Sequence, residues 1–172
     1  PTIKDVLKEY GDDVRFIFKH NPLSFHKKAL LAAEASIEAQ KQGKFWEYHD
    51  KLFENQRALE RENLDSYAEE LGLDMAQFKA ALDGRVHKER ALLEQADAGE
   101  VKASGTPAFF INGRKLKGNS LDDFKGLLAT ELKAVKKGMM APRLIASANE
   151  AMICTKTITV RCQRLFRLNI LK

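Results

Sequence analysis

Three consecutive residues, Gly105, Thr106 and Pro107, are the segment of this sequence whose residue types and order best suit a functional role, the binding of an extended peptide. Proline has no main-chain N–H, so Pro107 fits the first position of the apolar strand predicted at 108–111, not its middle. If the Thr106–Pro107 bond is cis, the main chain of Thr106 faces outward and can pair with a passing extended peptide. A trans proline that only opens the strand is the alternative, since about one X–Pro bond in twenty is cis.

The two cysteines, Cys154 and Cys162, could do redox chemistry only if they met. On one continuous strand their Cα atoms would lie about 26 Å apart. A disulfide requires a separation of about 4.4–6.8 Å. Residues 155–161 contain no Gly, Pro or Asn to turn a hairpin between them. We therefore predict that both are free thiols.

The four histidines do not have the spacing of a metal site, since none forms a His-Glu-x-x-His pattern or has flanking cysteines. His20 and His26 flank the turn at Pro22 and are candidate neighbours of an active site, where they would tune the pKa of a reacting group. His49 falls on an apolar helix face, which predicts a hydrogen-bonded core residue. No metal and no cofactor are predicted.

Composition describes a soluble globular chain of 172 residues, with 44% hydrophobic and 31% charged residues. No apolar run approaches the roughly 20 residues that span a bilayer, and the N-terminal residues do not resemble a signal peptide. The net charge is +5, but six of the 29 basic residues and one of the 24 acidic residues follow Lys137. The preceding part is therefore neutral and offers no electrostatic basis for binding nucleic acid.

Hydrophobic periodicity predicts the elements that must position these residues. Asn112-Gly113 suits a type I′ hairpin turn, Asp74 and Ser120 suit helix N-caps, and residues 157–160 are strand-like but have no evident partner. Helices are predicted over residues 2–10, 25–42, 45–54, 64–71, 74–82, 85–98 and 120–137, and strands over 14–19, 108–111 and 114–116.

The run Val101-x-x-Ser-Gly-Thr-Pro-Ala-Phe-Phe-Ile-Asn-Gly, with Gln42-Gly-Lys-Phe-Trp46 before it, resembles the DsbA-like thiol–disulfide oxidoreductases. The resemblance covers roughly residues 1–137. It implies an α/β chain with a thioredoxin-like fold and an inserted helical domain. Residues 1–24 and 99–137 would form the partial thioredoxin-like domain, and residues 25–98 the insertion.

Residues 138–172 lie beyond the resemblance and form a basic tail. It could be a nucleic-acid or membrane arm, a small native appendage, or an out-of-frame extension. We favour the last, because the tail has no coherent periodicity, and expect it to be non-native or poorly ordered.

The resemblance also implies a function. Such proteins exchange disulfides through a Cys-x-x-Cys pair at the start of their first long helix. Residues 1–137 contain no cysteine, and we expect the first strand and the start of that helix to precede Pro1. Gly105, Thr106 and Pro107 would contact the substrate, so no catalytic residue is assigned and the chain alone is expected to be inactive.

The implied partners are cysteine-containing proteins or peptides as substrates, with a redox partner protein for the intact parent. The implied location is periplasmic or otherwise extracytoplasmic. Oxidase, isomerase and reductase activity stay open, because the residues between the cysteines decide among them. The alternative function is a non-catalytic, chaperone-like module that binds peptides through the same loop by strand addition.

Overall fold

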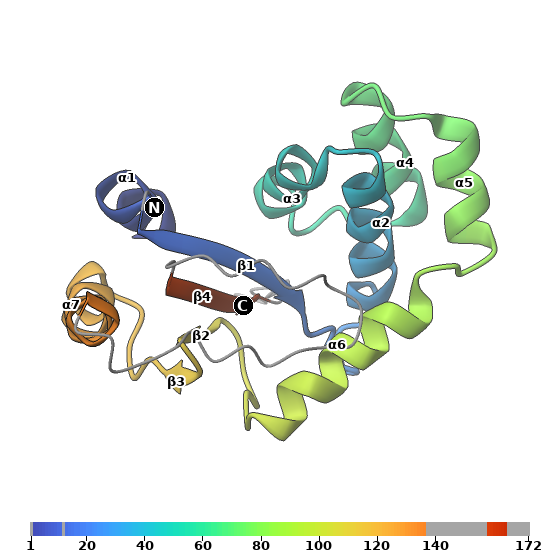
Figure 1. Cartoon of the computed structure of the whole chain (residues 1–172). Helices are drawn as coiled ribbons and strands as arrows, with labels where there is room; N and C mark the ends of the chain where they lie inside the picture. The colour runs from blue at the N-terminus through green and yellow to red at the C-terminus, as the bar shows by residue number, and fades with distance from the viewer. Residues whose placement is uncertain (1, 12, 137–157, 165–172) are drawn as a thin grey trace. The chain divides into compact units, whose positions relative to one another are not determined.

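The computed structural model describes residues 2–11, 13–136 and 158–164. These residues form seven α-helices and four β-strands, as Figure 1 shows. The chain divides into two compact units. The first unit combines the residues up to Lys19 with those from Pro107 to Gln163, and the second combines His20–Thr106 with the residues from Arg164 onward. The mixed α/β class expected from the sequence is therefore present.

The first unit is a four-stranded sheet with two helices. The sheet order is β1-β4-β2-β3, and β2 pairs antiparallel with both β3 and β4. Helix α1 packs beside α7, and α7 packs on β2. The elements are α1 (Thr2–Tyr10), β1 (Val14–His20), β2 (Ala108–Ile111), β3 (Arg114–Lys115), α7 (Leu121–Lys136) and β4 (Ile158–Arg164).

Strand β4 covers the strand-like segment for which periodicity suggested no partner. Its register runs from Ala108 opposite Gln163 to Ile111 opposite Val160. Long-range pairing of this kind leaves no local signal in the sequence, because nothing near the segment specifies the strand that it meets. The other residues of the predicted tail, 138–157 and 165–172, lie outside the described residues.

The turn between β2 and β3 has the geometry that its sequence predicts. Asn112 and Gly113 have φ angles of 49° and 81°, the two positive values that a type I′ turn requires. The turn places Ile111 opposite Arg114. Because the side-chain period of a strand is two, this register fixes which residues of β2 enter the core.

The core of the first unit lies between the sheet and its helices. Phe109 of β2 meets Phe124 of α7 edge-on, with ring centroids 4.9 Å apart and an interplanar angle of 71°. This is a favoured arrangement for an aromatic pair. The buried members of the cluster are Val6, Val14, Phe109, Ile111, Leu116, Phe124 and Leu128.

The second unit is helical and is organised around α2. Most residues of α2 are buried, and several are alanines, which allow neighbouring helices to approach closely. Helices α3, α4, α5 and α6 all pack against or around it (Figure 1). The helices are α2 (Ala29–Lys41), α3 (Phe45–Glu54), α4 (Arg61–Glu70), α5 (Met75–Asp83) and α6 (Lys88–Glu100).

Helix α2 begins at Ala29 and not at residue 25 as periodicity predicted. The preceding residues form tight turns, in which the N–H of His26 donates to the carbonyl of Leu23 and the N–H of Ala29 donates to that of His26, both at 2.9 Å. Phe25, which periodicity placed on the helix, is 71% exposed.

Candidate functional site

The Gly105-Thr106-Pro107 loop leads directly into β2 and is open to solvent. Gly105 and Pro107 are exposed and Thr106 is half-buried, whereas all four residues of β2 are buried. A Cβ atom added at Gly105 would meet nothing within 4 Å. The loop therefore presents accessible main chain at the start of a strand that the core holds rigidly.

The last residue of β1, His20, and the two residues after it are held by hydrogen bonds to α6 and to the segment before the loop. The N–H of His20 donates to Glu94 Oε2 at 2.7 Å. Asn21 Nδ2 donates to the carbonyl of Ala103 at 3.2 Å, and Gln95 Nε2 donates to the carbonyl of Pro22. Because Ala103 lies two residues before Gly105, the bond from Asn21 places residues 20–22 beside the segment that leads into the loop.

The imidazole of His20 faces the helices. His20 is 5% exposed, and its Nε2 lies 3.5 Å from Ser36 Oγ. Ser36 Oγ in turn donates to the carbonyl of Ala33 at 2.9 Å. Its lone pairs can therefore accept a hydrogen bond from His20 when the ring carries its proton on Nε2. The ring also meets Phe45 edge-on at 6.2 Å. This histidine is held within the helical unit and not displayed to solvent.

His26 and His49 have different surroundings. His26 is half-buried, with its ring centroid 4.4 Å from that of the exposed Phe25. His49 is 8% exposed, and its Nδ1 lies 3.0 Å from Asp50 Oδ1. Its ring also stacks obliquely on Phe53 at 4.4 Å. The prediction that His49 is a hydrogen-bonded, largely buried residue is confirmed.

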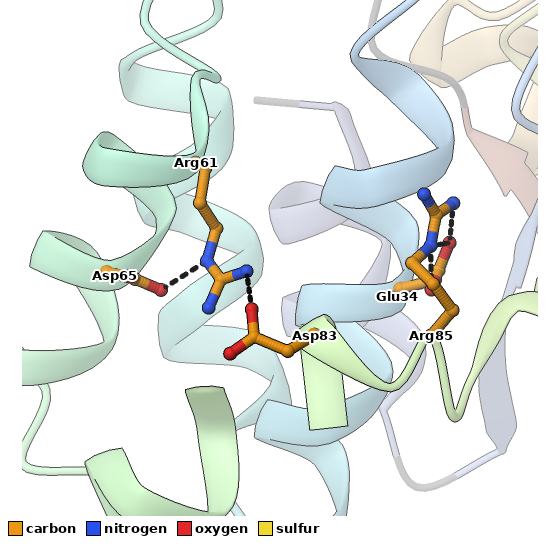
Figure 2. Close-up of polar contacts among 5 residues, drawn as sticks. All are labelled: Glu34, Arg61, Asp65, Asp83 and Arg85. Atoms are coloured by element: carbon orange, nitrogen blue, oxygen red, sulfur yellow. Dashed lines mark hydrogen bonds and ion pairs between the residues drawn. The ribbon is translucent and has the colours of Figure 1, made fainter. Parts of the chain in front are cut away.

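Helix α6, which hydrogen-bonds His20 and Pro22, is anchored to α2 by two side-chain contacts from residues just before its start. Arg85 has a left-handed φ of 51°, and its Nε donates to Glu34 Oε1 at 3.1 Å and to Oε2 at 3.0 Å. Figure 2 shows this contact beside the exposed contact of Arg61 with Asp83. His87 Nε2 lies 2.7 Å from Glu38 Oε2, with both side chains buried.

These buried acids were not identified from the sequence as important. Glu34, Glu38 and Glu94 fall among many Glu residues with helical spacing, and only their burial distinguishes them. Glu34 is 0% exposed and Glu38 is 1% exposed, and carboxylates buried to this extent require polar or charged partners. Nothing local in the sequence indicates that Arg85 and His87 supply them.

Among the described residues, no three His, Cys, Asp or Glu side chains gather closely enough to hold a metal ion. No described helix combines the length and apolar character needed to cross a membrane. The described residues up to Lys136 include no cysteine. The exposed part of this region is the loop at Gly105 and Pro107, directly before β2.

The antiparallel pair β2 and β3, the helices beside it and the helical segment that follows β1 in sequence define a mixed α/β protein. The model of the DSBA-like thioredoxin domain matches residues 2–129. The chain belongs to this family.

Its curated relatives are much longer proteins. The chain is 44% identical over 115 residues to a Na(+)/H(+) antiporter NhaA of Herminiimonas arsenicoxydans, covering 67% of this chain and 18% of the antiporter. It is 40% identical over 120 residues to the Na(+)/H(+) antiporter NhaA 3 of Salinispora tropica, covering 69% of this chain and 18% of that protein. The chain thus spans less than a fifth of these relatives. No solved structure matches it.

Proposed function

We propose that this chain is the polypeptide-binding part of a DsbA-like thiol–disulfide exchange protein and has negligible exchange activity by itself. The observation that carries the proposal is the exposed Gly105-Thr106-Pro107 loop at the start of the buried strand β2, in a chain of the DSBA-like family. Disulfide exchange begins with the attack of a thiolate on a disulfide. The only cysteines, Cys154 and Cys162, both follow the matched residues 2–129.

In this proposal the loop binds substrate through main-chain atoms. An extended polypeptide would pair with the N–H and C=O of Thr106. The main-chain nitrogen of Pro107 carries no hydrogen, so it would not compete as a donor. Such pairing is tolerant of sequence, as a protein acting on many partners requires. A Cys-x-x-Cys pair from outside residues 1–137 would supply the thiolate, and the substrates would be cysteine-containing polypeptides.

Two measurements test the proposal. In an insulin-reduction assay, the chain should give the background rate, and Cys154→Ser/Cys162→Ser should leave that rate unchanged. Turnover that survives both substitutions would contradict the lack of activity. Binding of a reduced, carboxymethylated unfolded polypeptide, followed by fluorescence anisotropy, should weaken about tenfold in Pro107→Ala. Pro142→Ala, a matched change elsewhere, should bind like wild type. Equal binding by both variants would reject the loop as the contact.

The antiporter relatives favour a second role. We infer that the domain is an accessory part of an extracytoplasmic or membrane-associated transport protein, since the aligned region belongs to chains named as Na(+)/H(+) antiporters. The test uses everted vesicles that contain the Herminiimonas arsenicoxydans antiporter with its matching region deleted. Deletion should reduce Na(+)/H(+) exchange, and producing this chain together with the shortened antiporter in the cells from which the vesicles are made should restore part of it. Unchanged exchange after deletion would remove this role.

A further inference from the structure

Helix α6 has an outer face that combines exposed aliphatic residues with acids. Its inner face packs on α2. On the outer face, Leu92 is 40% exposed and Leu93 is 60% exposed, and Ala96 is exposed one turn further along. Residues three or four apart are neighbours on a helix, so Asp97 and Glu100 adjoin Leu93 and Ala96. We call these five residues, Leu92, Leu93, Ala96, Asp97 and Glu100, the α6 surface.

The acids of the α6 surface are placed against the helix dipole. The partial charge at a helix C-terminus is negative, so acidic side chains are unfavourable there and basic ones favourable. The last turn of α6 contains Asp97 and Glu100 and no base. Within the part of the chain that the structure describes, neither carboxylate has a side-chain partner. Residues 92–107 contain three acids and one base, Lys102, so a cation from another molecule would offset an uncompensated negative charge.

A tight turn joins the α6 surface to the Gly105-Thr106-Pro107 loop. The N–H groups of Lys102 and Ala103 donate to carbonyls of the last turn of α6 at 3.0 and 2.8 Å. Lys102 has a left-handed φ of 55°, so these bonds form the Schellman motif that commonly ends a helix. Because each residue extends a chain by at most about 3.6 Å, Thr106 lies within roughly 22 Å of Glu100. About seven residues of an extended polypeptide cover that distance.

We infer that the α6 surface selects the substrates of this chain, which are polypeptides with basic and aliphatic residues beside the segment that pairs with Thr106. The inference rests on the proposed function, because the loop would hold the main chain of the same substrate. Aliphatic residues of the substrate would cover the two leucines, and its Lys or Arg side chains would meet Asp97 and Glu100. Main-chain pairing is tolerant of sequence, so the preference for basic substrates comes from this charge complementarity.

Three fluorescein-labelled peptides that differ only in charge test the preference. Each has a central S-carboxymethylcysteine between two valines, so it cannot exchange disulfides, and a leucine on each side. Two positions on each side, about five to seven residues from the centre, are all Lys, all Gln or all Glu. Fluorescence anisotropy at low salt should show wild type binding the Lys peptide about fivefold more tightly than the Gln peptide, as two exposed ion pairs allow, and the Glu peptide least tightly. The preference should disappear at about 1 M salt, where the Debye length is about 3 Å.

Removal of the two acids should abolish the preference. Asp97→Asn/Glu100→Gln should bind the Lys and Gln peptides equally, and should bind the Gln peptide as wild type does. Glu62→Gln/Glu69→Gln is the matched control, since it removes two exposed acids from α4 and changes the net charge by the same amount. This control should keep the preference. Asp97→Asn/Glu100→Gln should resist urea at least as well as wild type, because it removes unfavourable charges from the last turn of α6.

Leu93→Ser tests the aliphatic part of the α6 surface. Because this change removes apolar contact and no charge, the variant should bind the Lys and Gln peptides about three- to tenfold more weakly and keep the preference between them. Val86 is 58% exposed and precedes the first residue of α6, so Val86→Ser supplies the control and should bind both peptides like wild type. Equal binding by the two serine variants would overturn the inference, because the substrate would then not cover the leucines.

The peptides also separate this inference from the proposed function. Equal binding of the Lys and Gln peptides by wild type would overturn the inference alone, and so would a preference that survives in Asp97→Asn/Glu100→Gln. If the Gln peptide does not bind wild type, or binds Pro107→Ala as tightly as wild type, the proposed function is contradicted instead.

Discussion

The ion pair between Arg85 and Glu34 offers a test of how the helical unit is held together. Glu34 lies in the middle of α2 with a side chain that is 1% exposed, whereas the side chain of Arg85 is 44% exposed. Arg85→Met retains much of the aliphatic stem but removes the guanidinium. The change should leave the carboxylate of Glu34 buried without its cation, while the apolar contacts of position 85 are largely kept.

The size of the effect follows from burial. Breaking a buried ion pair by removing one partner costs about 3–5 kcal/mol of stability. Because the side chain of Arg85 is partly solvated, we expect Arg85→Met to lower the free energy of unfolding by the smaller of these values, about 3 kcal/mol. Figure 2 contains a control with more exposed acids, since Arg61 contacts Asp83 and Asp65, whose side chains are 67% and 23% exposed. Arg61→Met should cost about 0–1 kcal/mol, as exposed pairs do.

The assay is urea unfolding followed by the fluorescence of Trp46. This residue is the only tryptophan in the sequence and lies in the helical unit, so it reports on the unit that the substitution disturbs. The double variant Glu34→Gln/Arg85→Met removes the buried charge as well as the cation, and its loss should fall to about 1 kcal/mol. The reasoning is refuted if Arg85→Met costs no more than Arg61→Met, or if Glu34→Gln gives no rescue.

Three further predictions concern single contacts. The Asp74 side chain accepts a hydrogen bond from the N–H of Gln77 at 3.0 Å, so Asp74→Ala should lower the stability of the helical unit by about 1 kcal/mol in the same urea assay, and Asp74→Asn by less. Leu128 is 0% exposed, so Leu128→Ala should cost about 2–5 kcal/mol in calorimetry, and the half-buried Leu127 less when changed to alanine. The Ser120 hydroxyl, and then its N–H, lower the pKa of Asp123. The stability that this carboxylate adds is therefore present above its unfolded pKa and is lost as the pH falls through the lower folded pKa. An NMR titration should show the lowered pKa in the native chain, and Ser120→Ala should raise it; an unchanged pKa would contradict the assignment.

Local features of the structure were predictable because their causes are local. The bounds of α3 and β2 match the periodicity, and the Asn112-Gly113 turn has the positive φ values that its residue types favour. The N-cap at Asp74 is likewise formed by neighbours in sequence. Such features depend on short-range sterics and hydrogen bonds, which a single sequence displays directly.

The contacts that assemble the candidate site were not predictable in the same way. The hydrogen bond from His20 to Glu94 joins residues 74 positions apart, and that from Asn21 to Ala103 joins residues 82 apart. No periodicity or residue pair in the sequence specifies either one. The loop residues themselves were identified, because proline and glycine mark the chain strongly. The roles assigned to Gly105, Thr106 and Pro107 in binding substrate stay predictions.

The place of β4 in the sheet determines the order in which this protein can fold during synthesis. Helices α2 to α6 come from one continuous stretch of the chain, so they can fold while the ribosome is still adding later residues. The sheet that the described residues form cannot be finished until Arg164 has emerged, because β4 is the last of the described strands in sequence. The described pairing of β2 with β4 therefore forms late in synthesis, whereas the contacts among helices α2 to α6 can form early.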